Sequence, residues 1–97
     1  MITYLITGEQ GSGKSCLAHV ISQGKDPVLE TTEERLGVDL RKKGTFEVVV
    51  VENVHFKSTE LKKLVISTLT TRILVLITNK PVPEDLQIYN LRRIHIS

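Results

Sequence analysis

Apolar residues along the chain form short runs that alternate with more polar stretches. The runs at 46–51 and 73–78 are nearly continuous in apolar residues, which indicates strands covered on both faces in a parallel sheet. Two further strands are expected at 2–7 and 94–96, and a weaker one at 28–30. The pattern therefore predicts five short strands.

The stretches between these runs carry apolar residues at helical spacing. A first helix is predicted over 14–22, where one face is apolar. A second is expected to start at the capping-box pair Thr31 and Glu34 and to stop at Gly44. A third is expected to begin at Ser58, which can cap it.

Alternation of strands and helices is typical of the α/β class, with right-handed crossovers and a parallel sheet between helical layers. The chain has 97 residues, a length that fits one domain over 1–97. The stretch from Lys80 to Asp85 contains two prolines and is expected to be an irregular loop.

A glycine-rich segment between the first strand and the first helix carries the candidate chemistry. Residues 8–15 read GEQGSGKS and match the pattern G-x-x-x-x-G-K-[ST]. Glycines let successive backbone N–H groups point into one concavity that holds phosphates, and the following helix N-terminus favours anions. In this pattern Lys14 reaches the β- and γ-phosphates, and the Ser15 hydroxyl ligates Mg²⁺. The residues expected to contact the nucleotide are Gly8, Glu9, Gln10, Gly11, Ser12, Gly13, Lys14, Ser15 and Cys16.

With this motif the chain resembles the P-loop NTPases, and two strands narrow the resemblance. Residues 48–53, VVVVEN, resemble a Walker B strand, which makes Glu52 a second expected Mg²⁺ ligand beside Ser15. Residues 74–79, LVLITN, are similar to the sensor-1 strand of AAA+ ATPases and the strand-Thr-Asn motif of superfamily-three helicases. The resemblance implies that Asn79 orients the attacking water or touches the γ-phosphate; its alternative role is in a turn before Lys80.

The resemblance also carries implications for the fold and for two arginines. It implies a three-layer core with strand order 5-1-4-3-2, and the chain stops before any helical lid. Arg92 and Arg93 come just before the last predicted strand, where these families place an arginine that acts on a neighbouring subunit's nucleotide. Solvated surface positions are the alternative. Asn53 departs from the family pattern, because a second acid usually polarises the attacking water there.

Composition excludes several other classes. Aromatic residues are 4% of the chain and the net charge is +2, so stacking platforms and a strong basic bias for nucleic acid are absent. The single cysteine, Cys16, excludes an internal disulfide and fits a reducing compartment; we expect it to be a small buried packing residue. The sequence shows neither zinc-ligand spacing nor a signal or membrane-spanning segment. A cytoplasmic protein is expected, in the host cytoplasm if the chain is viral.

The leading hypothesis is a minimal AAA+-like ATPase that binds ATP with Mg²⁺ and hydrolyses it slowly. The resemblance implies a homo-oligomer in a DNA transaction such as replication or packaging, with DNA or a replication protein as partner. Its small size is similar to compact ATPases encoded by viruses and plasmids. Two alternatives remain open: a small nucleoside or nucleotide kinase, and a nucleotide-responsive regulatory binding protein with little hydrolysis.

Overall fold

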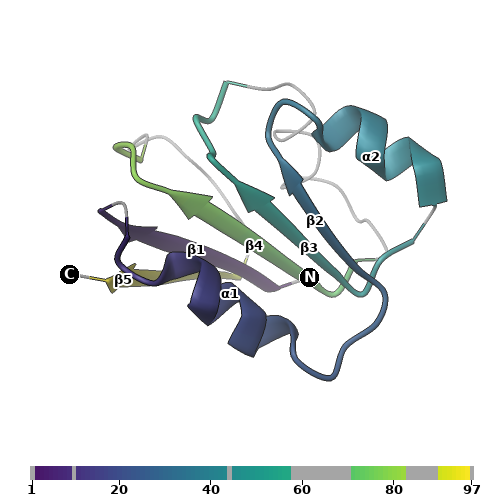
Figure 1. Cartoon of the computed structure of the whole chain (residues 1–97), viewed down its shortest axis with the longest axis horizontal. Helices are drawn as coiled ribbons and strands as arrows, with labels where there is room; N and C mark the ends of the chain where they lie inside the picture. Colours follow the sequence, from purple (N-terminus) through teal and green to yellow (C-terminus); the bar gives the residue numbers. More distant parts are fainter. Residues whose placement is uncertain (1, 10, 44, 58–70, 83–89, 97) are drawn as a thin grey trace.

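A computed structural model describes residues 2–9, 11–43, 45–57, 71–82 and 90–96 of the chain. These residues build an α/β fold around a parallel sheet (Figure 1). The elements are β1 (Ile2–Gly8), α1 (Lys14–Ser22), β2 (Val28–Thr32), α2 (Leu36–Lys43), β3 (Val48–Glu52), β4 (Ile73–Thr78) and β5 (Leu91–Ile96).

The five strands form one sheet in the order β2-β3-β4-β1-β5, and every neighbouring pair is parallel. Counted from the β5 edge, this order reads 5-1-4-3-2. Because all strands run the same way, the ends of β1, β3 and β4 lie at one edge of the sheet (Figure 1). The predicted α/β class and parallel five-stranded sheet are therefore confirmed.

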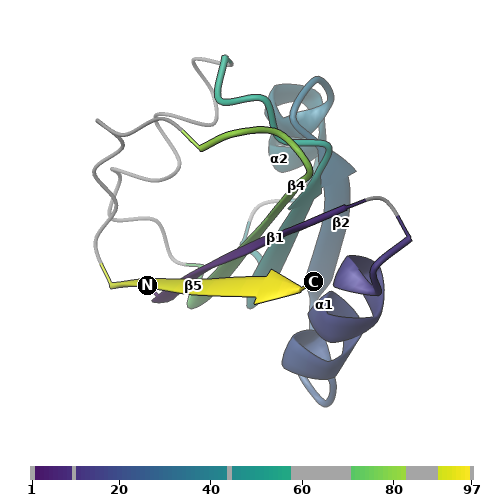
Figure 2. The same ribbon diagram turned by 90° about the vertical axis from the view of Figure 1, so that its left-hand side faces the viewer.

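Side chains of alternate strand residues form two separate cores, one on each face of the sheet. One core joins Leu36 of α2 to Val49, Val51, Leu74 and Leu76 of the central strands. The other joins Ala18 of α1 to Val48, Val50, Val75 and Ile77. The alternation explains why β3 and β4 are apolar at nearly every position. Seen from the β5 edge, α1 lies on one side of the sheet (Figure 2).

The first helix has the predicted bounds, but the second begins later than the sequence indicated. Thr31 is the fourth residue of β2, where it pairs with Val51, so it does not cap a helix. Its hydroxyl instead donates a 2.6 Å hydrogen bond to the Asp39 carboxylate of α2. Thr31 is buried in the sheet, where β-branched residues are favoured, and α2 starts at Leu36.

The last strand is longer than predicted. β5 begins at Leu91 rather than at Ile94 and pairs with β1 along its whole length. Arg92 and Arg93 consequently lie inside a strand, opposite Tyr4 and Leu5, and not before it. The third predicted helix and the part of the 80–85 loop beyond Val82 lie outside the described residues.

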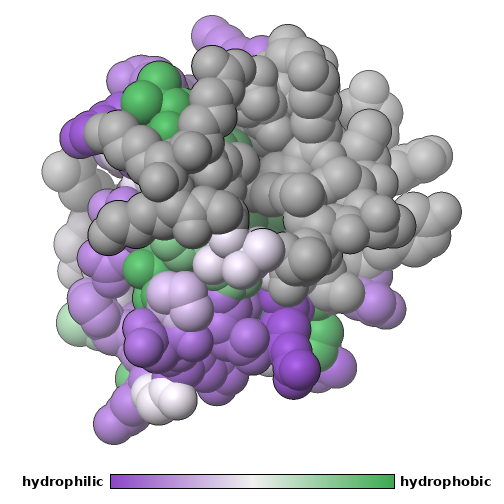
Figure 3. Space-filling model, turned by 90° about the vertical axis from the view of Figure 1, so that its right-hand side faces the viewer, coloured by the Kyte–Doolittle hydropathy of each residue, from purple (hydrophilic) through white to green (hydrophobic). Residues whose placement is uncertain are grey.

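The described surface is largely hydrophilic on the side shown in Figure 3, where hydrophobic atoms form small separate groups. Val20 and Val38 are the large hydrophobic side chains exposed among the described residues. None of the described helices has the length and apolar character needed to cross a membrane.

Candidate functional site

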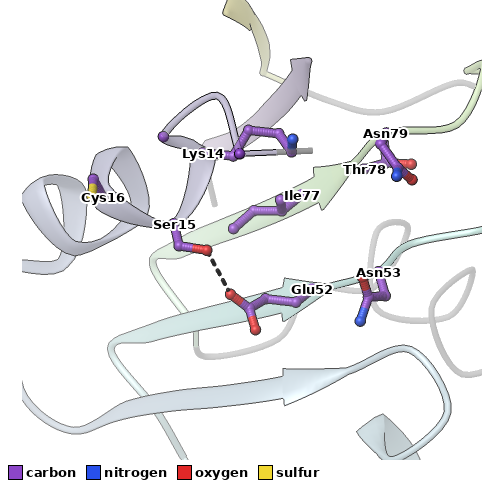
Figure 4. Close-up of a pocket in the computed structure, with 10 residues that line it drawn as sticks. Lys14, Ser15, Cys16, Glu52, Asn53, Ile77, Thr78 and Asn79 are labelled. Carbon is purple, nitrogen blue, oxygen red and sulfur yellow. Dashed lines mark hydrogen bonds between the residues drawn. The ribbon is translucent and has the colours of Figure 1, made fainter. Parts of the chain in front are cut away.

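The ends of β3 and β4 and the start of α1 surround a pocket of about 450 Å³, within the roughly 300–1,000 Å³ range of small-molecule sites. The pocket lies beyond the carboxyl ends of parallel strands, where open α/β sheets bind their ligands. Its lining residues are Gly11, Gly13, Lys14, Ser15, Cys16, Glu52, Asn53, Ile77, Thr78 and Asn79 (Figure 4).

A hydrogen bond connects the glycine-rich loop to the end of β3. The Ser15 hydroxyl donates to Oε1 of Glu52 at 3.0 Å, and Ile77 of β4 lies between Lys14 and Glu52 (Figure 4). Glu52 is half-buried and is not the solvent-facing acid that a strand end alone would predict. The structure thus brings together the two residues that the sequence nominated as Mg²⁺ ligands.

Lys14 lies against the backbone of its own loop. Its ammonium donates hydrogen bonds to the carbonyl oxygens of Gly8, at 3.0 Å, and Glu9, and to the Ser12 hydroxyl at 3.3 Å. It forms no ion pair with a carboxylate of the described residues. The ammonium therefore lines the pocket without a carboxylate partner among the described residues.

The loop takes its shape from glycines in conformations that other residues rarely adopt. Gly11 and Gly13 have φ values of 81° and 90°, in the left-handed region. Gly13 precedes α1, and no side chain of the described residues caps the first turn of that helix. Since the first N–H groups of a helix lack partners within it, they are placed to bind an anion at this pocket.

Gly8 has both an unusual φ of 155° and no room for a side chain. A Cβ atom there would lie 2.5 Å from the carbonyl oxygen of Ile96 and 2.8 Å from the Ser12 hydroxyl. The end of β5 is thereby packed tightly against the start of the loop. Gly24 has a φ of 77° but open space around it.

We therefore expect Gly8→Ala to lower the free energy of unfolding by about 3 kcal/mol, from backbone strain plus overlap. Gly24→Ala, which meets backbone strain alone, should cost about 1 kcal/mol. Urea unfolding of both variants measures the difference. Equal losses would show that the contact between Gly8 and Ile96 relaxes without cost.

The ends of β3 and β4 are held together beyond the last ladder pair. The Val54 N–H donates to the Ile77 carbonyl at 3.0 Å, and the buried Thr78 hydroxyl donates to the Val54 carbonyl at 2.7 Å. The Lys80 N–H in turn donates to the Thr78 hydroxyl at 3.0 Å. Asn79 sits between these two anchored residues and is exposed at the pocket, so its position is fixed by its neighbours.

The side chain of Cys16 lies elsewhere than the sequence predicted. Cys16 is exposed and lines the pocket, so the prediction of a buried packing residue is wrong; it lies on the outer side of the first turn of α1, while Ala18 faces the sheet. Gln10 lies outside the described residues.

The two arginines do not lie at the pocket of their own chain. Arg92 pairs with Tyr4, four positions before Gly8, which separates it from the loop by about 13 Å along the strand. Successive strand residues point to opposite faces, so Arg92 lies on the face that α1 covers and Arg93 on the other. Both side chains are exposed.

Several structural features near the site gave no signal in the sequence. The Thr78 hydroxyl bridge depends on the turn after β3, where Asn53 has a φ of 55°. His95 Nδ1 lies 2.9 Å from the Thr7 hydroxyl oxygen, at hydrogen-bonding distance. This contact depends on the register between β1 and β5. Elsewhere, Glu33 follows β2 and is 5% exposed, and its Oε1 has no hydrogen-bond partner among the described residues. Polar residues are common in turns and near strand ends, so none of these contacts could be predicted from residue type alone.

Comparisons with known proteins add no functional assignment. No protein-family model matches the chain, and no curated protein is significantly similar to it.

Proposed function

We propose that the chain binds ATP together with Mg²⁺ and slowly hydrolyses the terminal phosphate. The observation that carries this proposal is the 3.0 Å hydrogen bond between Ser15 and Glu52, in a pocket that Lys14 also lines. The Ser15 hydroxyl and the Lys14 ammonium, both at the start of α1, converge there with the Glu52 carboxylate at the end of β3. That combination suits a metal-bound polyphosphate.

The residues at the pocket fit Mg²⁺. Magnesium prefers oxygen ligands and is held by one or two carboxylates plus phosphate oxygens and waters. Ser15 and Glu52 supply two such oxygens within hydrogen-bonding distance of each other. The described residues contain no group of three or more His, Cys, Asp or Glu that could hold a metal ion by itself. Bound there, the ion would neutralise charge on the phosphates.

The remaining residues have separable roles in the proposed reaction. Lys14 binds the β- and γ-phosphates through its charge, and the glycine-rich loop and the uncapped first turn of α1 donate N–H groups to them. Asn79, held at the end of β4, orients the attacking water or contacts the γ-phosphate. Glu52 is the one carboxylate in the described lining, which leaves water activation weak and turnover slow.

The finer assignment of the fold belongs to the same proposal. A three-layer P-loop NTPase core is supported by the strand order and by helices that pack on opposite faces of the sheet. The AAA+ or superfamily-three type is supported by Glu52 and Asn79 at the ends of adjacent strands.

Asn53 occupies the position of the expected second acid. We expect Asn53→Glu to raise turnover about ten-fold or more, because a carboxylate beside Glu52 would accept a proton from the attacking water. The φ of 55° at Asn53 suits Asn better than Glu, so the variant should also lose about 1 kcal/mol of stability. Steady-state phosphate release and urea unfolding test both effects. Normal ATP binding with unchanged turnover would show that this is not the vacant base position.

Oligomerisation and the arginines follow from the resemblance and from the placement of β5. Arg92 and Arg93 lie away from the pocket of their own chain. Either arginine can therefore act only on a nucleotide that is bound to a second copy of the chain. An arginine supplied in this way is worth on the order of 10³ in rate. The two point to opposite faces of an edge strand, so we expect one of them, and not both, to be required.

A mixing experiment tests that requirement. Each variant, Arg92→Ala or Arg93→Ala, is mixed with Lys14→Ala, and phosphate release is compared with that of the separate proteins. The variant that lacks the required arginine should regain activity when it is mixed with Lys14→Ala. Some interfaces in that mixture pair an intact loop from one chain with an intact arginine from the other. Turnover that is independent of protein concentration, with no restoration, would contradict an arginine acting between subunits.

Phosphate release from ATP, measured over a range of protein concentrations with and without DNA, tests the proposed activity as a whole. Release that rises with protein concentration supports an oligomer, and stimulation by DNA supports a role in replication or packaging. A second candidate, a regulatory binding protein, is favoured by Asn53. Tight Mg·ATP binding with no phosphate release under any of these conditions would select it.

A further inference from the structure

A second pocket, of about 540 Å³, adjoins the first. It lies between the ends of β1 and β5 and the segment that follows β4, and its lining includes His95, Lys80 and Val82. The proposed hydrolysis of ATP uses Gly8, Glu9 and Asn79 of this lining, and it gives no role to Lys80, Val82 or His95. Its size is within the roughly 300–1,000 Å³ of sites that hold small molecules.

The two pockets meet at the end of the nucleotide site that would hold the terminal phosphate. Asn79 lines both. Gly8 and Glu9 line the second pocket, and their carbonyl oxygens accept hydrogen bonds from Lys14 of the first. Since Lys14 and Asn79 are the residues proposed for the γ-phosphate, a ligand in the second pocket would lie next to that phosphate.

One part of the lining carries hydrogen-bond donors. Lys80 is exposed and makes no ion pair with a described residue. His95 is held at Nδ1 by the Thr7 hydroxyl, and its other ring nitrogen has no partner among the described residues. An ammonium, an imidazole and the Asn79 amide are groups that bind phosphate oxygens.

The rest of the lining limits what kind of anion fits. Pro81, Val82 and Ile96 contribute apolar surface, against which one face of a planar ring can pack. Glu9 adds a carboxylate, and its repulsion disfavours a second polyphosphate. A single phosphate group on a molecule with a planar ring, whose faces can lie against apolar side chains, satisfies both conditions.

From this arrangement we infer that the second pocket binds a nucleoside monophosphate as an acceptor for the terminal phosphate of ATP. The role as acceptor rests on the proposed function, whereas the binding itself does not. Lys80 and His95 hold the monophosphate, and its base lies against Pro81, Val82 and Ile96. The chain would then transfer phosphate to this acceptor faster than to water.

The transfer balances without a catalytic base. An oxygen of the monophosphate attacks the terminal phosphorus of ATP and forms a new P–O bond. The bond from that phosphorus to the bridging oxygen breaks, and its electron pair leaves with ADP, so that two diphosphates result. A phosphate monoester has a second pKa of about 6 and is largely dianionic at pH 7, so no proton has to be removed. The lack of an acid at Asn53 therefore slows this transfer less than it slows hydrolysis, in which a proton must be removed from water.

Binding is tested first, in a variant whose ATP site is disabled. In Lys14→Ala, adenosine, guanosine, cytidine and uridine monophosphates are titrated while the ring signals of His19, His55 and His95 are followed by NMR. At least one monophosphate should shift His95 alone, and the matching nucleoside should not. Lys80→Ala should weaken that binding at least about ten-fold, whereas Lys25→Ala, which alters an exposed lysine after α1, should leave it unchanged.

Transfer is tested second, in the wild-type chain with ATP and the monophosphate that binds. Diphosphate of the acceptor should form faster than free phosphate, and His95→Gln and Lys80→Ala should each slow it about ten-fold or more. A His95 signal that no monophosphate shifts, or that nucleosides shift equally, overturns the site. Monophosphate binding without transfer, in a chain that hydrolyses ATP, overturns the acceptor role. Monophosphate binding in a chain that does not bind ATP keeps the site and rejects the proposed function instead.

Discussion

A Lys14→Ala variant is expected to bind Mg·ATP at least about 100-fold more weakly than the wild-type chain. The ammonium is the one cation in the described lining of the first pocket, and its hydrogen bonds go to loop oxygens rather than to a carboxylate. A charge in that setting contributes to phosphate binding and little to the core. Equilibrium titration with ATP measures the loss.

The control for this change is Lys25→Ala. Lys25 is exposed beyond the end of α1 and away from the pocket lining, so its loss should leave affinity for Mg·ATP unchanged. Circular dichroism and urea unfolding should show that both variants keep the wild-type fold. Unchanged affinity in a folded Lys14→Ala variant would contradict phosphate binding at this loop.

Glu52→Gln is expected to lower the rate of ATP hydrolysis about 100-fold or more. The amide keeps the size of the side chain, and its oxygen can still accept the hydrogen bond from Ser15. It removes the negative charge that would hold Mg²⁺ and polarise the attacking water. The loss should therefore appear in kcat and in the dependence on Mg²⁺, with stability close to wild type.

Glu47→Gln serves as the matched control. Glu47 lies just before β3 and pairs with Arg72 at 3.5 Å, at the opposite end of the strand from Glu52. A surface pair of this kind contributes roughly 0–1 kcal/mol to stability, and hydrolysis should not change. A Glu52→Gln variant with wild-type turnover and the same Mg²⁺ dependence would remove Glu52 from the site.

Much of the fold could be predicted because the strongest signals are local. The first helix has its predicted bounds, and β4 covers the predicted run of apolar residues. Strand ends were less predictable, since pairing with a neighbour decides them. β5 gains Leu91, Arg92 and Arg93 because β1 is long enough to pair with them, a fact that no property of those three residues encodes.

The candidate site also combines features that could be predicted from the sequence with features that could not. The approach of Ser15 to Glu52 could be anticipated, because the motif and the strand end both belong to one edge of a parallel sheet. The exposure of Cys16 could not be anticipated, because only the packing of Ala18 decides which side of the first turn of α1 faces the sheet. The second pocket was likewise hidden, because His95 and Thr7 meet only through the register of two strands 88 residues apart in sequence.

Calorimetric titration of the wild-type chain with ATP, in the presence and absence of Mg²⁺, tests the central claim most directly. If Ser15 and Glu52 hold the ion beside the phosphates that Lys14 binds, one ATP should bind per chain, at least about ten-fold more tightly with Mg²⁺ than without it. The absence of ATP binding, or an affinity that Mg²⁺ does not change, would contradict it.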